Sequence, residues 1–157
     1  MERGLTMAEM LVAIGIVAIL AAVSVPPLLS MVAGQRVKTA TFDLYSAMSY
    51  ARSEAIKRNT VVTIIPRGGA FANGYDLMVG TAVLRSQMGS PDVSIDSPPG
   101  VLLAFDGFGR LTAPVRYKLE LTSGRQGTTP KRCLVISTSG RPAIQVDKNN
   151  DGNCANS

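Results

Sequence analysis

The sequence opens with MERGLTMAEM LVAIGIVAIL AAVSVPPLLS (residues 1–30), a short charged segment followed by a long apolar one. From Met10 to Gln35, 26 consecutive positions carry no charged side chain, although charged residues make up 17% of the 157-residue chain. The 20 residues from Met10 to Leu29 are just long enough, as a helix, to cross a hydrocarbon core of ~30 Å. This composition argues against a simple cytosolic domain, a disordered chain and a multi-span membrane protein.

Glu9 lies directly before the apolar stretch. A carboxylate at the edge of a membrane helix is costly to place in lipid, and we find no side chain nearby to pair with it. The sequence therefore predicts a partner on another chain. The alternative is a cleavable secretory signal that is cut near Ala21 or Ala22. Against it, Glu2 cancels Arg3 near the N-terminus, and the apolar stretch continues past that cut into a second helical pattern.

Gly4, followed five residues later by Glu9 and then by the apolar stretch, resembles the class III signal of type IV pilins and type II secretion pseudopilins. The resemblance implies that a prepilin peptidase cuts between Gly4 and Leu5 and that the new amine of Leu5 is methylated. It also implies that Glu9 neutralises the N-terminal amine of a neighbouring subunit during assembly, which would remove the cost of an unpaired carboxylate in lipid. Pro26 stands where the family has its proline, and Pro26 and Pro27 are expected to kink or break the helix.

From Arg36 the pattern becomes that of an amphipathic helix, with Asn59 as its expected stop. The apolar positions recur at spacings of three and four: Val37, Ala40, Leu44, Ala47 or Met48, Ala51 and Ala55. Residues 60–147 then read as short strands separated by turn residues. The expected strands are Thr60–Ile65, Tyr75–Leu84 with an allowance for a bend at Gly80, Val93–Ile95, Val101–Phe105, Val115–Leu121, Cys133–Thr138 and Ala143–Val146.

These patterns predict an α+β protein with a long N-terminal helix packed on a small, mostly antiparallel β domain. The resemblance implies that this fold is type IV pilin-like. Two later segments resemble the GspH/FimT group of minor pilins and pseudopilins: Phe105–Arg110, and Leu134–Arg141 with its Ser-Gly-Arg turn. We interpret Gly109 and Gly140 in these turns simply as residues that allow positive φ in hairpins. The expected parts are a leader at 1–4, a transmembrane or filament-core helix at 5–33, the amphipathic half of the helix at 34–58 and a β-rich domain at 59–157.

The net charge of +5 is concentrated in the last third of the chain, where residues 101–157 carry eight Lys and Arg against four Asp and Glu. This bias suits an anionic partner such as nucleic acid, or equally a solvated face. Some FimT-like proteins are linked to DNA uptake through a Gly-Arg-x-Arg signature, of which Gly140-Arg141-Pro142-Ala143 keeps only the first arginine. The candidates for contacts to DNA phosphates near a tip are Arg125, Lys131, Arg132 and Arg141.

Cys133 and Cys154 lie outside any CxxC spacing, and the chain has no His, so we expect no redox motif or metal site. In an exported chain the natural use of the pair is a disulfide, worth about 3 kcal/mol by loop entropy. Their presence also favours a type IV pilus protein over a secretion pseudopilin. Asp147–Gly152 matches the first half of an EF-hand loop, with Asp147, Asn149 and Asp151 as weak calcium candidates, but the twelfth ligand would fall beyond Ser157. An Asx-type turn is therefore the preferred interpretation.

We expect neither an enzyme nor a cofactor, because a Ser or Cys nucleophile would lack its usual His base and the chain has no P-loop or zinc spacing. The resemblance identifies a minor pilin, processed by prepilin peptidase from a single-pass precursor of the bacterial inner membrane whose C-terminal domain is periplasmic. After assembly it would lie in the pilus or at the cell surface. The expected partners are other major and minor pilins, the prepilin peptidase, the inner membrane and, in one alternative, DNA.

Two alternative functions stay open at this point. One is a pilus-tip DNA-binding protein for natural transformation. The other is a type II secretion minor pseudopilin of the H type.

Overall fold

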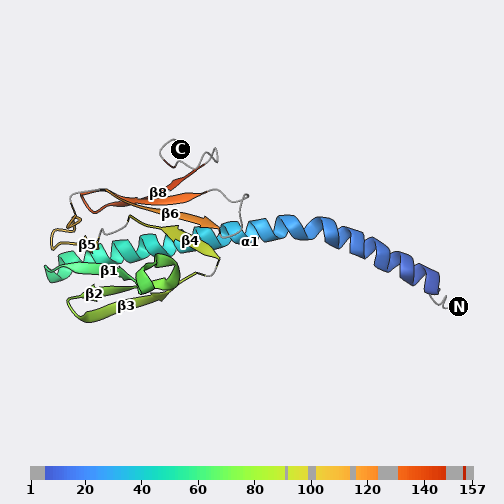
Figure 1. The fold of residues 1–157 in the computed structure, drawn as a ribbon, viewed down its shortest axis with the longest axis horizontal. Helices are drawn as coiled ribbons and strands as arrows, with labels where there is room; N and C mark the ends of the chain where they lie inside the picture. The colour runs from blue at the N-terminus through green and yellow to red at the C-terminus, as the bar shows by residue number, and fades with distance from the viewer. Residues whose placement is uncertain are drawn as a thin grey trace. The chain divides into compact units, whose positions relative to one another are not determined.

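The computed structural model describes residues 6–90, 92–98, 102–113, 116–123, 131–147 and 154, without the side chains of residues 23–28. Its contacts divide the chain into two compact units, Met1–Val32 and Ala33–Ser157. Helix α1 (Met7–Arg58) supplies the first unit and continues into the second (Figure 1).

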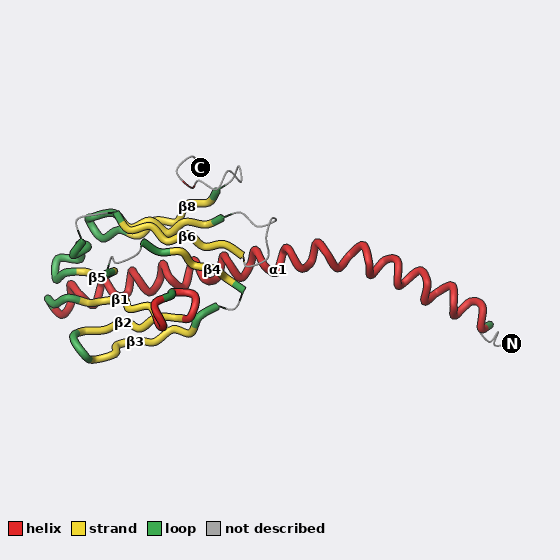
Figure 2. Tube along the Cα trace, viewed as in Figure 1, coloured by secondary structure: helices red, strands yellow, loops and turns green. Residues whose placement is uncertain are grey.

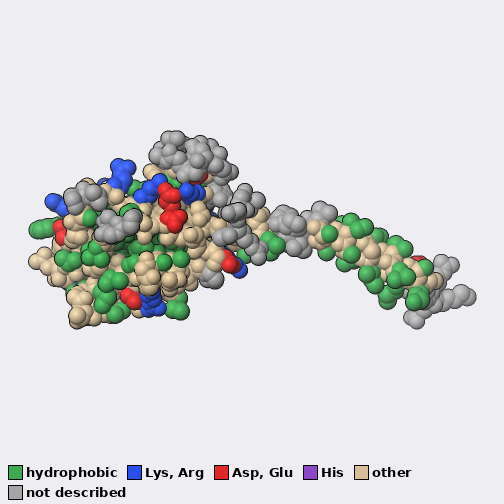
Figure 3. Space-filling model, viewed as in Figure 1, with side chains coloured by type: hydrophobic (Ala, Val, Ile, Leu, Met, Phe, Trp, Pro, Cys, Tyr) green, Lys and Arg blue, Asp and Glu red, His purple; other side chains and the backbone are tan. Residues whose placement is uncertain are grey.

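The first unit contains the N-terminal half of α1. Its large apolar side chains from Met10 to Leu20 are more than half exposed, and Figure 3 shows hydrophobic side chains along this part of the helix. The backbone of α1 continues as helix through Pro26 and Pro27, so it is not broken there, and the kink stays a prediction. Within the described residues, no helix is both long and apolar enough to cross a membrane.

The second unit begins with the C-terminal half of α1, whose buried face is the predicted apolar one. Val37, Leu44, Met48, Ala51 and Ala55 are each no more than 1% exposed. Their spacings of seven, four, three and four place these positions on one side of a helix, which explains how the sequence pattern becomes a packing surface.

Asn59 ends α1 as predicted. Its φ of +48° is left-handed, a conformation that Asn tolerates better than most residues. The Asn59 N–H donates to the carbonyl of Ile56 at 3.3 Å, and the Thr60 N–H donates to the carbonyl of Ala55 at 3.2 Å. These two bonds form a Schellman motif, which satisfies carbonyls at the end of the helix.

Two four-stranded sheets are present among the described residues (Figure 2). Every strand pair in them is antiparallel. The first sheet has, in spatial order, β3 (Ala82–Met88), β2 (Gly74–Val79), β1 (Val62–Pro66) and β5 (Leu103–Phe105). The second has β4 (Val93–Asp96), β6 (Tyr117–Ser123), β7 (Arg132–Ile136) and β8 (Pro142–Val146). Two short 3₁₀ helices, η1 (Arg67–Gly69) and η2 (Phe71–Asn73), connect β1 to β2.

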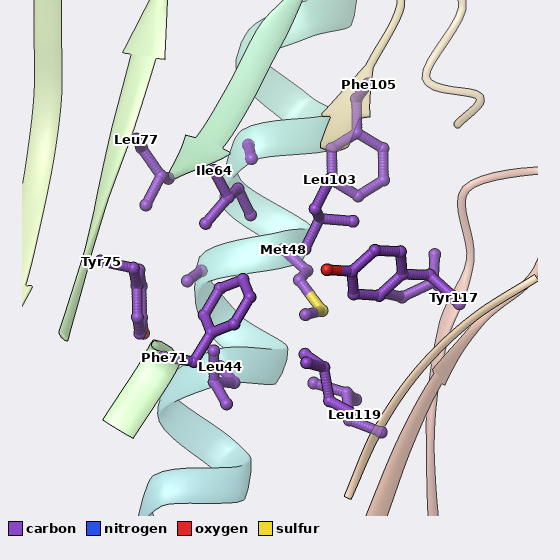
Figure 4. Packing of buried hydrophobic residues seen from close by; sticks show 14 of the residues in the cluster. Leu44, Met48, Ile64, Phe71, Tyr75, Leu77, Leu103, Phe105, Tyr117 and Leu119 are labelled. Carbon is purple, nitrogen blue, oxygen red and sulfur yellow. The ribbon is translucent and has the colours of Figure 1, made fainter. Parts of the chain in front are cut away.

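The hydrophobic core lies between the C-terminal half of α1 and both sheets. In Figure 4, Met48 of α1 has Ile64 and Leu77 of the first sheet on one side and Tyr117 and Leu119 of the second sheet on the other, and all are buried. One helix thus supplies the common surface on which both sheets pack, as expected for the α+β architecture.

The expected single strand Tyr75–Leu84 is wrong: the chain reverses there and forms the hairpin β2–β3. Val79 pairs with Ala82, so Gly80 and Thr81 make a two-residue turn, and Gly80 has φ +56°. Glycine adopts this angle without strain, which lets the chain turn instead of bend. The other expected strands match observed ones to within a few residues, with Val101 and Val115 outside the described residues.

Candidate functional site

Thr6 and Glu9 form a reciprocal pair at the start of α1. Glu9 Oε2 accepts hydrogen bonds from the Thr6 backbone N–H and from the Thr6 hydroxyl, both at 2.9 Å. In return, Thr6 Oγ1 accepts the Glu9 N–H at 3.3 Å. This is a capping box, in which two side chains satisfy backbone donors at the first turn of a helix.

The expectation that Glu9 has no partner nearby is therefore wrong. The Thr-x-x-Glu spacing of Thr6 and Glu9 is itself the sequence signal of a capping box and would have revealed it. Both side chains are exposed, so the carboxylate stays accessible to another chain. Gly4 and Leu5, the predicted cleavage site, lie outside the described residues.

Cys133 and Cys154 form the predicted disulfide, with Cα atoms 6.1 Å apart. Both cysteines are buried and pack with Val135 in a small cluster separate from the main core. Asp147, the first calcium candidate, is 1% exposed, and its N–H donates to the Lys131 carbonyl at 2.9 Å. Asn149 and Asp151 lie outside the described residues, and no group of three or more potential ligands gathers in the part of the chain that is described.

The first motif turn, Asp106–Arg110, is closed by its own carboxylate. Asp106 Oδ1 accepts the N–H groups of Phe108 at 3.0 Å and Arg110 at 2.8 Å, and the Asp106 carbonyl accepts the Gly109 N–H at 2.8 Å. An aspartate that bonds backbone groups just ahead of it is a common means of fixing a tight turn. The sequence Phe-Asp-x-x-Gly-Arg therefore encodes a hydrogen-bonded turn directly after β5.

The second motif turn, Ser137–Arg141, packs directly on the first. Gly140 has φ +76° and Gly109 has φ +73°, so both glycines adopt the left-handed backbone conformation, as predicted. That interpretation is incomplete, because a Cβ on Gly140 would lie 1.9 Å from the Gly109 carbonyl oxygen. The same oxygen accepts a 2.9 Å hydrogen bond from Arg52 Nε of α1. The two turns and the helix thus meet at Gly109, and sequence reasoning missed Arg52.

The four cationic DNA candidates do not all gather at one place. Lys131 Nζ lies 2.7 Å from Glu120 Oε2. Arg132 pairs with Val146 at one end of the β7–β8 ladder, whereas Arg141 lies in the turn at the other end. Five residues of strand at about 3.3 Å each separate these ends by roughly 16 Å. Arg125 lies outside the described residues.

Glu120 of β6 is held between Lys118 of the same strand and Lys131, which directly precedes β7. Its Oε1 lies 2.7 Å from Lys118 Nζ and its Oε2 2.7 Å from Lys131 Nζ. The hydrogen bonds from Lys118 and then Lys131 lower the pKa of the Glu120 carboxyl, and the bond to Glu120 raises the pKa of Lys131. Lys131 is consequently engaged within the fold.

The comparison with protein families gives a match to the GspH family, described as type II transport protein GspH, over residues 40–140. The chain belongs to the GspH family. This confirms the GspH/FimT-like relationship expected from the sequence. The family consists of structural, non-catalytic subunits, so the chain is a structural subunit and not an enzyme.

Crystal structures of the type IV minor pilin FimU from Pseudomonas aeruginosa have a similar fold, which confirms the predicted fold class. The P21 crystal form has a TM-score of 0.62 at 22% identity and covers 74% of this chain and 92% of that chain. The P65 form has a TM-score of 0.59 at 23% identity and covers 73% and 94%. A comparison with curated proteins gives no significant match.

Proposed function

We propose that this GspH-family chain is a minor pilin, a non-catalytic subunit that is incorporated through α1 into a type IV pilus or its tip complex. In this proposal prepilin peptidase cuts the inner-membrane precursor after Gly4, and the amine of Leu5 is methylated. The charge-free segment Met10–Gln35 and the exposed apolar side chains of α1 support it, because both suit a helix surrounded by lipid and later by sister helices.

The accessible carboxylate of Glu9 is the observation that carries the proposal. It stands at the start of a helix with no further charge until Arg36. Thr6 supplies hydrogen bonds to Glu9 but no positive charge. A cationic amine from a neighbouring subunit would neutralise the carboxylate, and such a pair is strong where water is excluded.

Replacing Glu9 with Ala tests this role. We expect Glu9→Ala to be inserted and cleaved normally, but its amount in sheared pili to fall at least tenfold, because no carboxylate remains to pair with the amine. Immunoblots of the membrane fraction measure insertion and cleavage, and immunoblots of the pilus fraction measure incorporation.

Thr6→Ala is the matched control, because it removes the capping hydroxyl and keeps the carboxylate. It is expected to weaken the helix start by about 1 kcal/mol and to leave incorporation within twofold of the unmodified chain. Normal incorporation of Glu9→Ala would contradict the proposal.

A type II secretion pseudopilin is the second candidate, and the family description favours it. The disulfide between Cys133 and Cys154 supports the pilus instead. DNA binding at a pilus tip has less support, since Lys131 is paired with Glu120 and Arg141 lies far from Arg132. A deletion scored separately for piliation, protein secretion and transformation distinguishes the three.

A further inference from the structure

A groove opens in the second unit between α1 and the turn that leads into β8. Its volume is about 390 Å³. The helix contributes one face, the turn contributes Arg141, and β8 contributes its first residue, Pro142. The lining includes Tyr45, Ser49, Arg52, Ile56, Arg141 and Pro142.

The groove is built by the contacts around Gly109. The Gly109 carbonyl accepts Arg52 Nε at 2.9 Å and leaves no room for a side chain on Gly140. Arg141 follows Gly140 directly, so this close approach brings it to the groove that Arg52 also lines. The two motif turns thus have a consequence beyond closing hairpins, because they bring two arginines from distant parts of the sequence to one groove.

The positive charges of Arg52 and Arg141 are available to a ligand. Arg36, Arg58 and Arg67 each form an ion pair with a carboxylate, but within the described residues neither Arg52 nor Arg141 does. Among the residues that the structure describes, the lining contains no Asp or Glu. A guanidinium has five N–H donors, and the Arg52 bond to Gly109 uses only the one on Nε. This chemistry suits a carboxylate or a phosphate.

The helix beside the groove points to a protein partner. Phe42, Tyr45 and Ile56 are 48%, 37% and 48% exposed. With Ser49 and Arg52 between them, their spacings are three, four, three and four, which places them on one helix face. Exposed apolar side chains arranged in this way suit a peptide or helix, whereas a nucleic acid backbone needs an extended cationic surface.

We propose that this groove binds an acidic segment of a neighbouring filament subunit, whose carboxylate accepts hydrogen bonds from Arg52 and Arg141. The apolar residues that flank this carboxylate would pack on Phe42, Tyr45 and Ile56. The partner class rests on the proposed function as a filament subunit. The inference that the groove binds an acidic group rests only on its charge and geometry.

A binding experiment on the full chain in detergent micelles tests the groove directly. The probe is the peptide acetyl-Leu-Asp-Leu-Glu-Leu-amide, and its matched neutral form has Asn and Gln in place of Asp and Glu. NMR follows the side-chain Nε–H signals of Arg52 and Arg141. We expect the acidic peptide to shift both signals and the neutral form to bind at least tenfold more weakly.

Variants locate the binding. Ser53 also lines the groove, so Ser53→Trp fills the groove and keeps both arginines. Arg141→Gln and Ser53→Trp are each expected to weaken acidic-peptide binding at least tenfold. Arg85→Gln, on the exposed strand β3, is the matched control and should bind normally. Thermal unfolding of each variant checks that the fold is kept, and Ser53→Trp decides the outcome if Arg141→Gln does not fold.

Two outcomes of the binding experiment would overturn the proposal. One is that the acidic peptide shifts neither arginine. The other is that a single-stranded oligonucleotide or inorganic phosphate competes for the same signals more tightly than the peptide does. In cells, Arg141→Gln should lower incorporation into pili, and normal incorporation would also count against the groove. Glu9→Ala is scored separately, so failure of the groove is distinguishable from failure of the filament role.

Discussion

Gly140 must meet two physical requirements at once. Its φ of +76° is costly for residues with a Cβ, and its missing side chain is needed because the Gly109 oxygen lies where a Cβ would be. Sequence reasoning recognises the first requirement from a Ser-Gly-Arg turn. The second is invisible in sequence, because it arises between two turns that are some 30 residues apart.

Gly140→Ala separates these requirements when compared with Gly69→Ala. Gly69 has φ +78°, but nothing lies within 4 Å of the Cβ it would gain. Gly69→Ala should therefore show only the backbone strain, about 1 kcal/mol of unfolding free energy. Gly140→Ala should cost about 3 kcal/mol or more, because the turns must also move apart. Denaturant unfolding measures both, and equal losses would show that the contact at Gly109 contributes nothing.

At the scale of elements, Glu120 of β6 forms one ion pair within its own strand, with Lys118, and one with Lys131, which directly precedes β7. Its pKa lies below its ordinary value of 4.5, first because of Lys118 and then because of Lys131. A lowered folded-state pKa contributes stability above pH 4.5, and that stability is lost as the pH falls through the folded-state value. Because the group is partly exposed, the contribution should be at most about 1 kcal/mol.

Glu120→Gln tests this linkage. The unmodified chain should be more stable than the variant near pH 7, and the difference should disappear as the pH is lowered below the folded-state pKa of Glu120. Lys118→Met is the companion variant, since it should raise the Glu120 pKa measured by carboxyl ¹³C NMR. A stability difference independent of pH would assign the effect of Glu120 to packing.

The elements that sequence patterns predicted well are those whose signals are local. The buried face of α1, its stop at Asn59 and the alternation of β6 each follow from spacing within one segment. The hairpin at Gly80 was not predicted, because residues that favour β-strands continue on both sides of this single glycine. The groove could not be predicted, because α1 and the turn before β8 meet only in the folded chain. The helical spacing of Phe42, Tyr45 and Ile56 on α1 is nevertheless visible in the sequence.

The molecule as a whole divides between a unit whose apolar side chains are exposed and a unit that buries its own. The buried apolar residues described form clusters in the second unit, beginning at Val37 of α1. The described part of the first unit is almost entirely the N-terminal half of α1, and its large apolar side chains are exposed. The described hydrophobic core is thus contained within the second unit.

A fragment of residues 33–157 is therefore expected to fold in water without detergent. It keeps the buried face of α1, both sheets and the disulfide, so thermal unfolding should be cooperative and near-ultraviolet circular dichroism should match that of the full chain in detergent. A fragment of residues 46–157 is the matched control. It lacks Val37, Ala40 and Leu44, whose loss leaves cavities costing several kcal/mol, about 2–5 for a leucine alone. Cooperative unfolding of the shorter fragment, or aggregation of the longer one, would show that the core does not depend on α1 in this way.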